Sequence, residues 1–265
     1  MRPSQKRAAA LLTVLGIVIT IAIVIAVSQQ PTTAPDYLEQ ARTAQKRGDT
    51  AAAIVALKAH VQASPDSTEA RLQLASLLRD TRPDEALTIL QRVPPTDPQW
   101  TTALQQVAVL HLLAGRQDHA AAVLKAIVET EPQNFGAQLS LAEIYFNQKN
   151  FDAALPHALE AARLNPNRAE TFLLISDIYD ELHNHIAMIA PLQAALAVNS
   201  DLYAAHLNLA YVHHRLGQLT EADEHARWCL QKNPREVPAL RILASIARND
   251  GRFEEADEWL AKAMT

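Results

Sequence analysis

Histidines in the C-terminal half of the chain are the side chains best suited to metal chemistry. His206 and His213 are seven residues apart, a spacing that places both on one face of a helix. Imidazole nitrogens bind zinc and other transition metals, so this pair is a candidate metal site. The other histidines of this region are His183, His185, His214 and His225. Histidines also pack inside helical proteins, and the surrounding elements must decide between the two interpretations.

Thiol, nucleophilic and phosphate chemistry have weaker support in the sequence. Cys229 is the only cysteine, which excludes an internal disulfide, and we interpret it as a small buried apolar residue. The motifs G-x-S-x-G and H-E-x-x-H and a Gly-rich phosphate loop do not occur. We therefore expect no enzyme activity, no catalytic residues, no metal and no cofactor.

The charge balance argues against nucleic acid as a partner. Three basic residues, Arg2, Lys6 and Arg7, precede a long apolar run. The rest of the chain carries 21 Lys and Arg against 29 Asp and Glu, a net charge of −8. A surface of this sign repels phosphate groups, so we expect no binding to nucleic acid.

The apolar run from Ala8 to Val27 contains no charged residue. Twenty residues of helix reach about 30 Å, the thickness of the hydrocarbon core of a bilayer. We predict a cytoplasmic tail (1–7), an uncleaved transmembrane signal-anchor helix (8–27) and a linker (28–34). Because the positive charges precede the run, the rest of the chain should lie across the membrane. A signal peptide cleaved after Ala26-Val27-Ser28 is the alternative.

Beyond the linker, one sequence pattern recurs along the chain. "FDAALPHALEAARLNP" at residues 151–166 returns as "QLTEADEHARWCLQKNP" at 218–234 and, shortened, as "RFEEADEWLAKAMT" at 252–265. The proline or its substitute at the end of this pattern recurs at intervals of 33 or 34 residues: Pro65, Pro98, Pro132, Pro166, Ser200 and Pro234. Such a fixed period predicts one structural unit stacked many times.

Each unit has the pattern of two helices, so the fold class is all-α. In the fourth unit Leu139, Ala142 and Phe146 share one helix face, and Ala154, Ala158 and Ala161 share one face of the second helix. Small residues at these places let neighbouring helices approach closely. The seven expected units lie near 34–67, 68–100, 101–134, 135–168, 169–202, 203–236 and 237–265.

This pattern resembles the tetratricopeptide repeat family, whose 34-residue unit is a helix–turn–helix. Leu141, Ala142, Tyr145, Ala154 and Pro166 match the family pattern in the fourth unit, and Leu209, Ala210, Gly217, Ala222 and Pro234 match it in the sixth. The resemblance covers nearly everything outside the anchor. It implies a right-handed α-solenoid over 35–265. His111 and His213 occupy the position where the family usually has Tyr, which favours a structural role for these histidines.

Two units depart from the pattern. The second unit is one residue short and contains Pro94-Pro95, so its second helix should end near Val93. The fifth unit has Met188 in place of Ala, and Pro191 inside its second helix, which should kink that helix or delay its start. The last unit has no polar capping helix after it, so Trp259 and its apolar neighbours should be covered by a partner or by a second copy in a homodimer.

In this family the first helices of the units line a peptide-binding groove. The resemblance therefore implies a groove in the fourth to seventh units. Its candidate residues are Glu143, Phe146, Leu173, Asp177, Asp180, Leu207, Tyr211, His214, Arg241 and Arg248. The acidic residues in the middle of this set would repel a carboxylate, which argues against a co-chaperone that holds carboxylate tails.

The resemblance and the anchor together predict a non-catalytic scaffold that binds protein or peptide clients. We expect it at a bacterial inner membrane with its repeats in the periplasm, in envelope protein assembly, secretion or maturation. Similar architectures occur among translocon-associated factors and in cytochrome c biogenesis. The alternatives are a cytosol-facing receptor or adaptor on an organelle or inner membrane, and a non-catalytic subunit of a glycosyltransferase or secretion complex.

Overall fold

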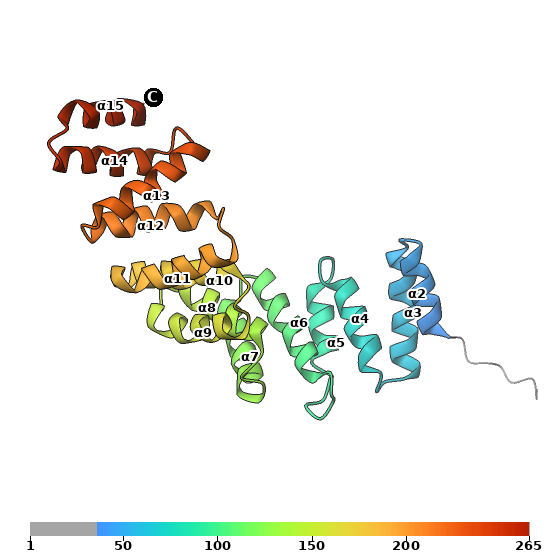
Figure 1. Ribbon diagram of the computed structural model, residues 1–265. Coiled ribbons are helices and arrows are strands. Elements are labelled where there is room, and N and C mark those ends of the chain that lie inside the picture. The colour runs from blue at the N-terminus through green and yellow to red at the C-terminus, as the bar shows by residue number, and fades with distance from the viewer. Residues whose placement is uncertain (1–35, 265) are drawn as a thin grey trace, which may run out of the picture. The chain divides into compact units, whose positions relative to one another are not determined.

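The structure, a computed structural model, describes residues 36–264 (Figure 1), and its regular elements within this range are all helices. The expected tail, transmembrane helix and linker at 1–34 lie outside the described residues. Among the residues described, no helix is both long enough and apolar enough to span a bilayer.

Fourteen helices make up the described part of the chain, and in sequence they form the seven expected pairs. Their bounds are α2 (Tyr37–Lys46), α3 (Thr50–Ala63), α4 (Thr68–Leu78), α5 (Pro83–Leu90), α6 (Trp100–Leu113), α7 (Gln117–Thr130), α8 (Phe135–Asn147), α9 (Phe151–Leu164), α10 (Ala169–Glu181), α11 (His185–Val198), α12 (Tyr203–Arg215), α13 (Leu219–Lys232), α14 (Val237–Asn249) and α15 (Phe253–Ala263). The prediction of an all-helical repeat is confirmed.

The chain divides into two compact units, one ending at Leu77 and the other beginning at Leu78. In the first unit α2 packs against α3, and Ala41, Ala53 and Leu57 are fully buried. Arg42 on α2 forms an exposed ion pair with Glu69 on α4, at 3.4 Å between Nη2 and Oε1.

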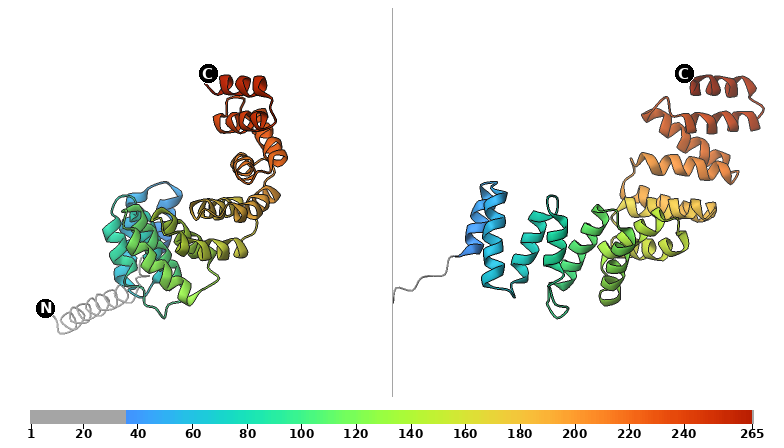
Figure 2. Two further views of the ribbon diagram at one scale, coloured as in Figure 1. Left: turned by 90° about the vertical axis from the view of Figure 1, so that its left-hand side faces the viewer. Right: turned by 180° about the vertical axis from the view of Figure 1, so that it is seen from behind.

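In the second unit each helix from α5 to α15 packs against the next one in sequence (Figure 2). First helices also touch one another, α8 against α10 and α12 against α14. Ala154, Ala158 and Ala161 are fully buried, as their shared helix face predicts. Because these side chains are small, α9 can lie close to both α8 and α10.

The turns inside six of the seven helix pairs, all except the α4–α5 pair, use a left-handed residue at a fixed place. Gly115, Gly217 and Gly251 have φ of 70°, 75° and 75°, and at equivalent positions Lys149 and His183 have φ of 58° and 56°. Only glycine adopts this conformation without a steric penalty from Cβ. Two of the turns therefore carry backbone strain that the others lack.

Two expectations about helix ends need correction. The second helix of the second pair, α5, ends at Leu90 rather than near Val93, and turns fill the rest of the segment. The expected delay at Pro191 is wrong, because α11 begins at His185 and continues through the proline. Its neighbours Met188 and Leu192 are buried, and their packing maintains the helix although Pro191 has no N–H to donate.

Candidate protein-binding surface

All ten residues predicted to line a groove lie on four first helices of the second unit: α8, α10, α12 and α14. We call their set the first-helix surface. Asn208 on α12 donates a hydrogen bond to Asp177 on α10, at 3.5 Å between Nδ2 and Oδ1. His214 on α12 bonds Ser245 on α14, at 2.9 Å between Nε2 and Oγ. With the direct contacts of α8 with α10 and of α12 with α14, these bonds make the surface continuous.

The apolar members of the set, Phe146, Leu173 and Leu207, also pack against the protein core. Phe146 packs on the core between α8 and α9, with its ring centroid 5.6 Å from that of Phe151. Leu173 and Leu207 are half-buried against the cores of the following helix pairs. They can offer only part of their surface to a partner.

The charged members and the tyrosine are the accessible part of the surface. Glu143, Asp177, Arg241 and Arg248 are exposed, and Tyr211 has 37% of its surface exposed. A binding partner would therefore meet charge and one aromatic ring first.

Glu143 on α8 and Asp177 on α10 are exposed and yet partly desolvated. The surrounding protein raises the pKa of the Asp177 carboxyl, and the nearby Asp180 charge raises it further. Desolvation also raises the pKa of Glu143, against the opposing effect of Arg168. Exposed carboxylates with this property are expected between neighbouring helices rather than on a ridge, because protein on several sides displaces water.

Asp180 and Tyr211 come together through His185. The imidazole Nδ1 of His185 lies 3.4 Å from Oδ1 of Asp180, and its ring meets the Tyr211 ring edge-on, with centroids 6.1 Å apart. Arg215 adds a contact at 3.3 Å from its Nη2 to Nε2 of His185, and its guanidinium carbon lies 5.9 Å from the Tyr211 centroid. Sequence reasoning treated His185 only as one of several structural histidines and missed this link between α10, α11 and α12.

At the other end of the surface, Arg241 and Arg248 are free of ion pairs within the described part of the chain. Other arginines nearby are engaged: Nε of Arg227 lies 2.7 Å from Asp223, and Nη2 of Arg252 lies 2.7 Å from Asp250. The two arginines of α14 therefore keep their hydrogen-bonding capacity for something else.

The histidines that suggested a metal site instead form a packed stack with an aromatic ring. His206 lies with its centroid 3.7 Å from that of Trp228, and its Nδ1 is 2.9 Å from Nδ1 of His225. His213 stacks on His225 at 5.9 Å and bonds Gln218 through Nδ1 at 2.6 Å. Residues 36–264 contain no group of three or more ligand side chains arranged to hold a metal ion. These histidines pack between α12 and α13.

His225 is the member of this stack that the sequence comparison of helix faces overlooked. Gln138 and His157 face each other across α8 and α9, 2.7 Å apart, and are separated by 19 residues as His206 and His225 are. An alignment of the repeat units places His206 and His225 at the positions of Gln138 and His157, and would have revealed the His206–His225 pair. Burial lowers the pKa of His225 to about 4, with further contributions from His206 and then His213, so its imidazole is neutral at pH 7.

Cys229 is fully buried, which confirms its interpretation as an apolar core residue. Burial raises the pKa of its thiol to about 11, and the charge of Glu236 adds to this effect. The thiol form that prevails at neutral pH is a weak nucleophile.

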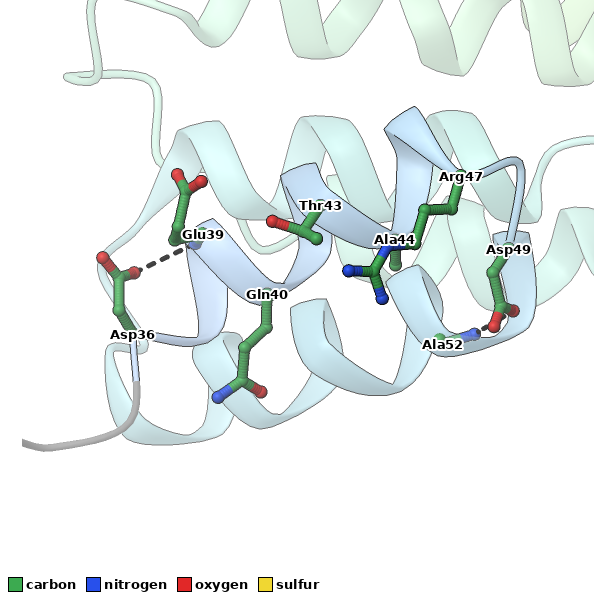
Figure 3. Close-up of a pocket in the computed structure, with 8 residues that line it drawn as sticks. All are labelled: Asp36, Glu39, Gln40, Thr43, Ala44, Arg47, Asp49 and Ala52. Carbon is green, nitrogen blue, oxygen red and sulfur yellow. Dashed lines mark hydrogen bonds between the residues drawn. The ribbon is translucent and has the colours of Figure 1, made fainter.

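A hollow in the first unit lies between α2 and α3 (Figure 3). Its two aspartates cap helices: Asp36 accepts a hydrogen bond from the Glu39 amide at 3.0 Å, and Asp49 accepts one from the Ala52 amide at 2.9 Å. Arg47 also lines the hollow. The carboxylates serve the helix N-termini, so we assign no chemistry to this site.

Comparison with known proteins gives consistent results. The family model for the tetratricopeptide repeat matches residues 44–108 and 111–178, which are half of the chain. A second model of the same description matches residues 203–228. The mouse "Superkiller complex protein 3" is 27% identical over 162 residues, which are 60% of this chain and 10% of that protein. This chain thus spans about a tenth of the length of that relative.

Solved structures with the same fold include bacterial repeat proteins. The C-terminal part of a repeat-containing protein from Cytophaga hutchinsonii has a TM-score of 0.70 at 13% identity, and the match covers 86% of this chain and 94% of that one. The structure of YrrB, described as a TPR protein with an unusual peptide-binding site, has a TM-score of 0.58 at 18% identity and covers 62% of this chain and 84% of that one. At these identities the likeness shows the fold alone.

Proposed function

The chain belongs to the tetratricopeptide repeat family, and from this premise we propose that it is a membrane-tethered scaffold for protein partners in envelope assembly, secretion or maturation. Proteins of this family are generally non-catalytic and bind protein or peptide partners. The observation that carries the proposal is the continuous first-helix surface, where exposed Glu143, Asp177, Arg241 and Arg248 make no ion pair with any described residue. Surfaces of this kind recognise peptide segments by apolar contacts and charge.

Site-specific crosslinking tests the binding surface. A photoreactive amino acid would replace Tyr211 or Glu143 in the full chain, and Leu159 would serve as the control. Leu159 lies on the second helix α9 and has 45% of its surface exposed. We expect adducts with the same partners from Tyr211 and Glu143 and none of these from Leu159. Adducts from Leu159 alone would contradict the proposal.

The tether and the location are supported by the N-terminal sequence. The uncharged run from Ala8 to Val27 has the length of a membrane span, and the basic residues that precede it favour a cytoplasmic N-terminus. An anchor of this kind raises the effective concentration of the repeats near partners that emerge at the membrane. We place the repeats in the periplasm.

A reporter fused after Thr265 tests this topology. Alkaline phosphatase requires an oxidising compartment, whereas a cytoplasmic fluorescent protein does not, so the pair reports opposite sides of the membrane. We expect activity of the phosphatase fusion. Activity of the cytoplasmic reporter alone would instead support a cytosol-facing adaptor, and release of the phosphatase fusion in soluble form would indicate a cleaved signal peptide.

A further inference from the structure

Charged residues on the four first helices are segregated by sign. Helices α8 and α10 carry acidic residues and no Lys or Arg: Glu143, Glu170, Asp177, Asp180 and Glu181. Helices α12 and α14 carry basic residues and no Asp or Glu: Arg215, Arg241 and Arg248. The sign therefore changes once along the surface, between α10 and α12.

The second helices of the same pairs do not show this segregation. Helices α9 and α13 contain both signs, and their charges pair locally. Arg163 lies 2.6 Å from Glu160, and Arg227 lies 2.7 Å from Asp223. Local pairing cancels the field of these helices at a distance, whereas unpaired charges of one sign leave a potential that acts on an approaching molecule. The polarity is thus a property of the first-helix surface.

The contacts of the acidic end leave most of its charge uncompensated. Asp177 accepts only the 3.5 Å hydrogen bond from Asn208, and no ion pair within 4.0 Å of Glu143 occurs among the described residues. Arg168, the nearest source of positive charge, lies 3.8 Å from Glu170 and stacks on the Phe135 ring at 5.7 Å. A cation supplied by a partner would find these carboxylates available.

We infer that the first-helix surface binds a polypeptide segment of another protein whose charges run in a matching order, with Lys or Arg over α8 and α10 and Asp or Glu over α12 and α14. This inference rests on the proposed function and adds the charge pattern and the direction of the bound segment. In the reverse direction both ends would face charges of their own sign, so complementarity selects one orientation. Tyr211, near the sign change, offers the central apolar contact.

The size of the surface sets the length of the segment. Neighbouring helices are about 8–10 Å apart, so the three steps from α8 to α14 extend over roughly 30 Å. An extended chain covers that distance with about nine residues and a helix with about 20 residues. A library of 20-residue peptides therefore accommodates both conformations.

The test is selection of random 20-residue peptides on the purified full chain in detergent micelles. We expect the selected peptides to be enriched in Lys and Arg in one half and in Asp and Glu in the other, in the same order throughout. Selected peptides without such an order would overturn the inference and leave the proposed function intact. Failure to enrich any peptide over empty micelles would overturn both.

Charge-reversal variants locate the two ends. For a selected peptide, Glu143→Lys with Asp177→Lys should weaken binding about fivefold or more, because two exposed attractive pairs become repulsive. Arg241→Glu with Arg248→Glu should have a similar effect. A variant with all four changes should prefer the peptide of reversed charge order, which a merely structural defect would not produce.

The matched control reverses two exposed acids on second helices, Glu129→Lys on α7 with Glu224→Lys on α13, and changes the net charge by the same amount. Its peptide affinity should stay within about twofold of the unaltered protein, as expected for charges screened by salt. An equal loss in the control would show that only net charge matters and would overturn the inference.

Sedimentation at low salt tests whether a second copy of this chain occupies the surface. A dimer that dissociates in the variant Glu143→Lys with Asp177→Lys would also overturn the inference.

Discussion

Relief of the left-handed strain at Lys149 and His183 should stabilise the protein. Both residues have positive φ, and both side chains are exposed and form no hydrogen bond or ion pair among the described residues. A non-glycine residue in this conformation costs about 1–2 kcal/mol, and glycine loses about 0.5–1 kcal/mol more backbone entropy on folding. Lys149→Gly and His183→Gly should therefore each raise the free energy of unfolding by about 0.5–1 kcal/mol.

The matched controls separate backbone from side chain. Lys149→Ala removes the side chain beyond Cβ and keeps the strain, so it should leave the unfolding free energy within about 0.5 kcal/mol of the unaltered value. Gly217→Ala introduces the strain at an equivalent turn, where a Cβ would meet no atom within 4 Å, and should destabilise by about 1 kcal/mol. Urea unfolding followed by circular dichroism measures all four. If Lys149→Ala stabilises as much as Lys149→Gly, the reasoning from backbone strain is wrong.

Three further predictions concern buried and half-buried side chains. Met188→Ala introduces the residue usual at this repeat position, but Met188 is buried and its truncation should lower the unfolding free energy by about 2–3 kcal/mol in urea titrations. Because the pKa of His225 falls to about 4 on folding, against an ordinary value near 6.5, its stabilising effect should be complete above pH 6.5 and decline toward pH 4. His225→Gln, with His206 and His213 left unchanged, should flatten the stability–pH profile between pH 6.5 and pH 4. Cys229 should react with a thiol reagent at pH 8 only after unfolding, because it is fully buried and its thiol has a pKa of about 11.

The repeat period was sufficient to predict most of the fold. The small residues at the helix contacts, such as Ala154 and Ala158, are fully buried, and the fourteen helices of the described residues follow one another in pairs. The expected delay of the helix start at Pro191 does not occur, because tertiary packing of the neighbouring Met188 and Leu192 outweighs a missing hydrogen bond. Local rules describe a helix in isolation, and α11 is stabilised mainly by its neighbours.

Contacts within the candidate surface were less accessible to sequence reasoning. The family pattern indicates which positions of a first helix face outward, but not how far one pair is rotated against the next. The link from Asp180 through His185 to Tyr211 depends on that rotation and on side-chain conformations, and no spacing rule predicts it. The charge segregation, in contrast, is visible in the sequence once the helix bounds are known.

The placement of acids at the end of α10 bears on whether that segregation is incidental. Asp180 and Glu181 lie in the last turn of the helix, where the partial negative charge of the C-terminus makes each carboxylate unfavourable by about 0.3–1 kcal/mol. Asp177 and Glu181 are also spaced i, i+4, which adds repulsion of about 0.2–0.5 kcal/mol. The weak bond from Asn208 and the His185 contact offset only part of this. An arrangement that opposes stability without local compensation is expected where a bound partner provides the compensation, because selection for stability alone would remove it.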